Sequence, residues 1–135
     1  MSKSNTTEND VIKFMFNNVA MPSYGSNLYL ALHTADPGEA GDQTTSECTY
    51  TSYARVAISR DAGGWTVSGN LSSNTALAQF PTATGGSETI THVSIGTASS
   101  GAGQILYSGA LNSSRAVSNG GQPQFAANSL QITED

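Results

Sequence analysis

The chain has 135 residues, of which 11% are charged, with five Lys or Arg against ten Asp or Glu. This length suits one compact domain with a single core. The net charge of -5 and the scattered basic residues argue against a nucleic-acid partner. No apolar run approaches the roughly 18 residues needed to cross a bilayer, so we expect no membrane partner. The 19 Ser and 15 Thr residues favour β structure with many turns.

The first segment has the pattern of a single helix. Thr7 is a candidate N-cap, and Pro22 marks the turn after the helix. Apolar side chains recur at helical spacing at Val11, Ile12, Met15, Phe16 and Val19. We therefore assign residues 1–27 to a helical arm and turn, and residues 28–135 to a β-sandwich. A helix this short needs a docking surface, which is either the core of its own domain, the preferred interpretation, or a neighbouring subunit.

From Leu28 onwards the hydrophobic period changes to two, which indicates strands. Leu28, Leu30 and Leu32 share one face of the first strand. A long polar stretch, residues 35–49, predicts an exposed loop or disorder. Further strands are predicted at residues 50–59, 65–68, 75–80, 88–95, 103–111, 115–117 and 124–132, with Gly or Pro between them. The fold class is therefore mainly β: one antiparallel, jelly-roll-like β-sandwich with a short N-terminal helix.

The sequence offers no recognisable catalytic centre. It has neither a G-x-S-x-G elbow nor an S-x-x-K motif that would activate a serine nucleophile. Cys48 lies in the acidic loop, where a thiolate is disfavoured. We predict no catalytic residue and no cofactor, and therefore a protein that is not an enzyme.

Metal binding is also weakly supported. Four acidic residues of the 35–49 stretch could wrap a calcium ion, but their spacing does not match a calcium loop, which favours solvated side chains: Asp36, Glu39, Asp42 and Glu47. His33 and His92 could share a metal, although a half-buried strand histidine with a hydrogen-bond partner is the more ordinary role. We therefore predict no metal site.

Aromatic residues raise the alternative of a carbohydrate-binding surface, because sugars stack on exposed rings. Most of them alternate along the predicted strands, where packing against a core or an interface is the more ordinary use. These residues are Trp65, Tyr24, Tyr29, Tyr50, Tyr53 and Tyr107.

The order of several local strings resembles a family of small virion proteins of tailed bacteriophages and prophages. The most specific string is LYLALHTADPG at residues 28–38. It is followed by weaker strings, namely YARVA (53–57), FPTA (80–83), THVSIG (91–96), ILYSGAL (105–111) and FAA (125–127). Members of this family are often labelled tail-fibre proteins, while others look like capsid decoration, or cement, proteins. The resemblance implies a non-enzymatic β-sandwich or jelly-roll-like subunit that sits on a capsid or tail surface as a symmetric oligomer.

The first functional hypothesis is a head decoration protein that binds and stabilises the closed capsid shell. Its partners would be the major capsid protein and further copies of itself, as a dimer or trimer. It would be made in the host cytoplasm and located on the capsid surface of the virion. The candidate interface combines the arm with strand-edge aromatics and one cation: Val11, Ile12, Met15, Phe16, Val19, Tyr29, Tyr53 and Arg55.

Two questions remain open: the role of Arg55 and the function of the protein. Arg55 could be an interface anchor, or it could form an internal salt bridge with Asp61 or another nearby acid. The protein could also be a tail or tail-fibre component that binds host surface glycans, through exposed aromatics near Trp65 or in the 35–49 stretch. A solute-binding or enzymatic sandwich is a third, less supported possibility.

Overall fold

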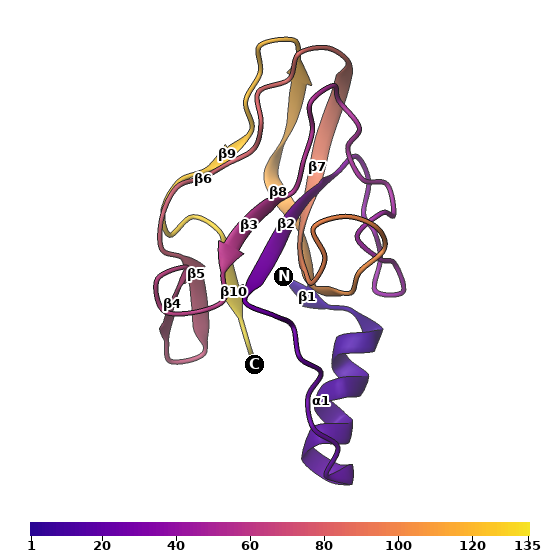
Figure 1. Cartoon of the computed structure of the whole chain (residues 1–135), viewed down its shortest axis with the longest axis vertical. Helices are drawn as coiled ribbons and strands as arrows, with labels where there is room; N and C mark the ends of the chain where they lie inside the picture. Colours follow the sequence, from indigo (N-terminus) through magenta and orange to yellow (C-terminus); the bar gives the residue numbers. More distant parts are fainter.

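A five-stranded antiparallel sheet, in the order β1-β8-β7-β2-β3, forms one layer of the molecule. The second layer consists of a three-stranded sheet (β10-β5-β4) and a two-stranded sheet (β6-β9), as the computed structural model of residues 1–135 shows (Figure 1). The elements are β1 (Ser2–Lys3), α1 (Asn5–Asn17), β2 (Asn27–His33), β3 (Val56–Ser59), β4 (Trp65–Ser68), β5 (Leu71–Asn74), β6 (Ala78–Gln79), β7 (Ser87–Gly96), β8 (Ile105–Ser118), β9 (Gln124–Phe125) and β10 (Gln131–Thr133). The mainly β, antiparallel fold with one short helix is confirmed.

The centre of the main sheet is the pair β2 and β7. Leu30 of β2 lies opposite Ile95, and Leu32 lies opposite Val93, so four apolar side chains share one face. All four are at most 2% exposed. The alternation that predicted this strand therefore identified the face that carries the core.

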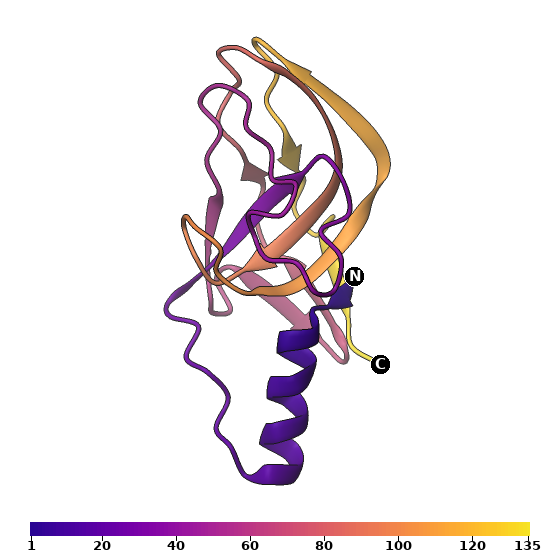
Figure 2. The same ribbon diagram turned by 90° about the vertical axis from the view of Figure 1, so that its right-hand side faces the viewer.

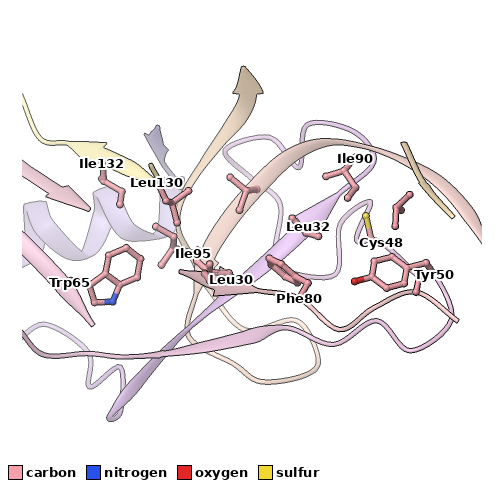
Figure 3. Packing of buried hydrophobic residues seen from close by; sticks show 14 residues of the cluster. Leu30, Leu32, Cys48, Tyr50, Trp65, Phe80, Ile90, Ile95, Leu130 and Ile132 are labelled. Atoms are coloured by element: carbon pink, nitrogen blue, oxygen red, sulfur yellow. The ribbon is translucent and has the colours of Figure 1, made fainter. Parts of the chain in front are cut away.

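The hydrophobic core lies between this face and the two smaller sheets. Fourteen buried residues form one cluster, with Phe80 fully buried near its middle (Figure 3). The Phe80 ring is stacked on Tyr53 at 6.2 Å between centroids and meets Phe125 edge-on at 6.4 Å. Trp65 of β4 closes one end of the cluster, and Tyr50 lies at the other.

The opposite face of β2 is covered by the polar stretch predicted at residues 35–49. This segment is ordered: His33 at the end of β2 contacts Thr45, and the fully buried Gln43 accepts a 2.9 Å hydrogen bond from the Ala98 backbone. A side chain at Gly96 would overlap Gln43, so a glycine is required where the loop meets β7. The prediction of an exposed or disordered loop is therefore wrong for its inner part.

Several predicted strands differ from the observed ones in extent. Of residues 50–59 only β3 is a strand, because the chain turns at Ser52, which has a φ of 78°, and the Tyr53 N–H donates to the Tyr50 carbonyl. The two strands predicted within residues 103–117 are joined in β8, which passes through a bulge between Ala110 and Arg115 and bends strongly (Figure 2). Residues 124–132 contain two short strands, β9 and β10, in different sheets.

Residues 61–64 form a turn, in which the Asp61 carboxylate accepts hydrogen bonds from the Gly63 and Gly64 backbone N–H groups. However, β4 pairs with β5 rather than with the strand before this turn. The connection is the two-residue loop Gly69-Asn70, in which Gly69 has a φ of 61°. A Gly at the first loop position is a hairpin signal, and it defines the three-stranded sheet.

Helix α1 projects from the body instead of covering it. In both views the helix extends beyond one end of the sheets, and the segment from Asn18 to Ser26 returns beside it to β2 (Figures 1 and 2). Ser2 and Lys3, which precede the helix in the predicted arm, pair with Ser108 and Tyr107 of β8 and so belong to the main sheet. None of the helical structure is long and apolar enough to span a membrane.

Candidate interaction surface

The base of α1 is fixed to the body by polar contacts. Ser4, not the predicted Thr7, is the N-cap, and its hydroxyl accepts a hydrogen bond from the Thr7 N–H at 3.2 Å. The buried Thr7 hydroxyl donates to the Ile105 carbonyl at 3.0 Å. Gln104 donates to the Asp10 carboxylate at 3.0 Å. These contacts hold the first two turns, and the helix ends at Asn18 in a left-handed conformation.

The outer part of α1 presents apolar side chains to solvent. Ile12, Met15 and Phe16 are 54%, 60% and 75% exposed, and Val19 beyond the helix is also exposed. Val11 alone of the predicted arm residues is half-buried. The preferred interpretation, in which the helix covers its own core, is therefore wrong, and the apolar stripe has no partner within the subunit. A soluble subunit rarely exposes several large apolar side chains side by side unless they serve an interaction.

The two aromatic residues predicted at strand edges are not at edges. Tyr29 lies in β2, paired with Ala57 on one side and Gly96 on the other, and is half-buried. Tyr53 precedes β3, and its hydroxyl accepts from the Leu32 N–H at 3.1 Å and donates to Glu47 at 2.9 Å. Tyr53 thus connects the core to the loop and is not an exposed contact residue.

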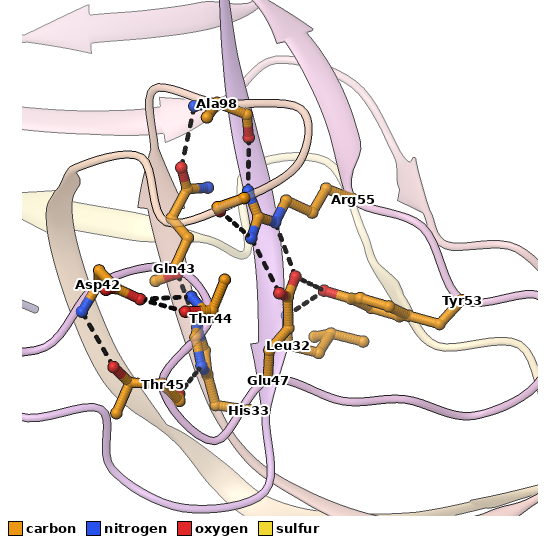
Figure 4. Close-up of polar contacts among 12 residues, drawn as sticks. Leu32, His33, Asp42, Gln43, Thr44, Thr45, Glu47, Tyr53, Arg55 and Ala98 are labelled. Atoms are coloured by element: carbon orange, nitrogen blue, oxygen red, sulfur yellow. Dashed lines mark hydrogen bonds and ion pairs between the residues drawn. The ribbon is translucent and has the colours of Figure 1, made fainter.

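The Arg55 side chain is buried and forms its polar contacts within the subunit. The hypothesis that Arg55 is an interface anchor is therefore wrong. Its side chain is 3% exposed and forms a two-pronged ion pair with Glu47, at 2.7 Å from Nε and 2.8 Å from Nη2 (Figure 4). Nη1 donates to the Ala98 carbonyl at 2.9 Å, and Nη2 also donates to the Gly101 carbonyl at 2.7 Å. The internal salt bridge is therefore the correct alternative, with Glu47 rather than Asp61 as the acid.

The other acidic residues of the 35–49 stretch have separate local roles. Asp36 accepts from the Gly38 N–H, and Asp42 accepts from the Thr44 backbone and hydroxyl. These hydrogen bonds lower the pKa of Asp42. Glu39 accepts from the Ser2 hydroxyl. No three acidic, histidine or cysteine side chains lie close enough together to hold a metal ion.

Cys48 is buried and has no activating neighbour. Burial, together with the nearby carboxylates of Glu88 and Glu47, raises the pKa of its thiol to about 12. The thiol is therefore protonated at neutral pH, as its position in an acidic loop predicted, and it behaves as a small core residue.

His33 is enclosed by the loop and the main sheet. Its Nδ1 lies 2.8 Å from the Thr45 carbonyl, so Nδ1 carries the proton, and Nε2 accepts from the Ser94 hydroxyl at 2.7 Å. Both ring nitrogens are therefore occupied within the subunit. Burial lowers the pKa of His33 below its usual value. His92, its neighbour across the sheet, is half-buried and is hydrogen-bonded to Thr91.

The low pKa of His33 predicts a loss of stability between pH 7.5 and 5.5. Below about pH 6.5 the unfolded chain takes up a proton at His33 that the folded chain resists, so the free energy of unfolding falls as the pH falls. The contribution at pH 5.5 is at most about 1.4 kcal/mol. Urea denaturation at both pH values measures it. His33→Gln should flatten the pH dependence, whereas His92→Gln should keep it; a flat wild-type profile contradicts the prediction.

Two residues that organise the loop were not identified from the sequence. Gln43 lies against Gly96 and Gly103, and a side chain at either glycine would overlap it. Glu47 was seen only as one acid among four, although it joins Arg55 and Tyr53. Gly96, the last residue of the string THVSIG, could have indicated this contact from the sequence. A glycine inside a strand marks a close approach of another chain segment.

A family model described as podophage GP4 fiber I protein gp80 (Gp80) matches residues 2–133 of this chain. The match covers α1 and both layers of the fold. No curated protein sequence matches the chain.

Proposed function

Because the chain belongs to the Gp80 family of podophage fibre proteins and is a phage structural protein, we propose that it is a fibre subunit attached to the virion through α1. The β body would be the displayed part, and the apolar stripe of the helix would contact a neighbouring virion subunit. The observation that carries this proposal is the exposure of Ile12, Met15 and Phe16 on a helix whose base is fixed to the body.

The geometry favours an attachment role over chemistry at a site. The histidine and cysteine side chains that could act as a base or nucleophile are buried or hydrogen-bonded within the subunit. Trp65 is 8% exposed, and Tyr50 is also buried, so neither ring offers a platform for stacking on a sugar. Glycan binding near Trp65 is therefore not part of the proposal, and we propose a non-enzymatic structural role.

A second candidate is the head decoration protein of the first hypothesis, with the major capsid protein as partner and the capsid surface as location. One compact β body with a single projecting helix is a suitable unit for repetition over a shell, since each copy needs only one attachment point. In that case the mechanism would be mass action, because a protein that binds only the closed shell stabilises it.

The number of copies per particle separates these candidates. We expect quantitative mass spectrometry of purified particles to find far fewer copies of this protein than of the major capsid protein. The copy number should be a multiple of the number of fibres on the particle. A ratio near that of the major capsid protein would instead support head decoration. Absence from washed particles, with the capsid protein as internal standard, would contradict both.

A further inference from the structure

A hollow of about 330 Å³ lies between the edge of the main sheet and the second layer. One wall is β3, and the other is the segment at residues 76–79, which contains β6 (Figure 1). All four residues of each wall line the hollow, whereas a strand that offered one of its faces would contribute only alternate residues. The hollow therefore runs along the edges of both segments, and β3 and β6 are not paired across it.

Strand β3 has unpaired backbone groups on the side that faces the hollow. It is the last strand of the main sheet and pairs only with β2. The Arg60 N–H donates to the Ser26 carbonyl, which fixes the alternation of the backbone along this antiparallel pair. The backbone groups of Val56 and Ile58 therefore also point to β2. Those of Ala57, an exposed residue between them, point away from β2 to the open edge.

This edge lacks the features that protect the other edge of the main sheet. There β1 pairs with one end of β8, while a bulge and the charged Arg115 interrupt the rest. The lining of the hollow beside β3 contains no charged residue and no proline. Leu77, on the wall opposite β3, is 49% exposed. An unprotected strand edge is a template for pairing with another chain, and the apolar wall beside it adds a surface to bury.

We propose that an extended segment of another virion protein pairs with β3 and adds one strand to the main sheet. Its backbone bonds to the N–H and C=O of Ala57, and its inward side chains fill the hollow against Leu77. The segment needs about four residues in strand conformation, or about 13 Å. Its side chains in the hollow are uncharged, and it carries no proline where it donates to β3. The inference rests on the proposed function only in taking the partner from the virion.

A second copy of this chain does not supply the segment. The inward side chains of β3, Val56 and Ile58, pack against the core cluster of their own subunit. A strand of a second copy keeps such side chains in its own core, so it cannot turn them into this hollow. The segment from Asn18 to Ser26 lies outside the sheets, but it contains Pro22 and returns beside α1. The occupant is therefore an extended segment of a different protein.

Hydrogen–deuterium exchange, read by mass spectrometry, tests the pairing in the isolated chain and in washed particles. The Ala57 amide should exchange fast in the isolated chain and at least about 10-fold more slowly in the particle. The Val67 amide is the matched control, because it points outward from the edge strand β4 but lies outside the hollow, and its exchange should be the same in both. Unchanged exchange at Ala57 in particles that contain the protein overturns this inference alone. Absence of the protein from the particles overturns the proposed function, and with it the source of the partner.

A photoreactive benzoylphenylalanine in place of Leu77 identifies the occupant of the hollow. After irradiation of the particles we expect an adduct with a protein other than this chain. Ala57→Pro should lower the adduct yield about 10-fold, because it removes a backbone donor that has no partner within the subunit. Ala57→Thr keeps the N–H and should keep the adduct, and circular dichroism checks that both variants fold. An adduct between two copies of this chain, or one whose yield survives Ala57→Pro, overturns the proposal.

Discussion

Replacing Arg55 with Ala is expected to lower the free energy of unfolding by about 3–5 kcal/mol, because it leaves the Glu47 carboxylate without its cation in a largely buried site. The same change removes the donors to the Ala98 and Gly101 carbonyls. Arg55 therefore holds three parts of the chain together: the 35–49 stretch, the loop after β7, and the segment that enters β3 (Figure 4).

Urea denaturation followed by circular dichroism measures this loss. Arg60→Ala is the matched control: Arg60 is exposed, its side chain makes a single hydrogen bond, to the Gly25 carbonyl, and the substitution should change the stability by no more than about 0.5 kcal/mol. A double-mutant cycle with Glu47→Gln tests the mechanism. The double variant should be clearly more stable than the sum of the two single losses implies, because the two side chains interact directly. Additive losses would mean that the ion pair does not carry the effect.

The sequence was sufficient to predict an element where the pattern that specifies it is local. Alternating residues predicted β2 and the main part of β7, and the same residues form the centre of the core. Apolar spacing predicted α1 to within a few residues. The failures lie where the outcome depends on distant groups. The helix pattern indicated an apolar face, but a pattern cannot tell whether that face meets its own core or another molecule.

The loop illustrates the same limit for polar residues. Glu47, Arg55 and Ala98 are far apart in the chain, and composition suggested only that acids on a loop are solvated. Folding brings them together because Gly96 and Gly103 leave room for Gln43, which fixes the loop on the sheet. Similarly, β8 extends past Ala110 because its pairing with β7 resumes at Arg115; the Asn112-Ser113-Ser114 segment, which has no strand pattern, lies in the bulge between the two paired parts.

The second large effect is expected for substitution of a buried phenylalanine, Phe80. An exposed phenylalanine, Phe16, has the opposite role in the fold and provides the comparison. Phe80 is fully buried and packs against Tyr53 and Phe125, so Phe80→Ala leaves a cavity in a core that cannot close around it. The expected loss is about 3–5 kcal/mol of the free energy of unfolding. For a domain of this size, whose total stability is of the order of 5–15 kcal/mol, such a loss brings the protein close to unfolding at ambient temperature.

Phe16→Ala makes the same chemical change at a side chain that is 75% exposed. The isolated subunit should keep its stability to within about 0.5 kcal/mol, as measured by urea denaturation. Its effect should appear instead in the amount of this protein that purified particles retain, because the proposed contact of α1 with a neighbouring virion subunit loses an aromatic anchor. Comparable destabilisation of the monomer by both substitutions would contradict this division, since it would mean that the arm packs on its own body. Loss of stability at Phe80 alone, and of attachment to the particle at Phe16 alone, would mean that the β core folds independently of the exposed face of α1.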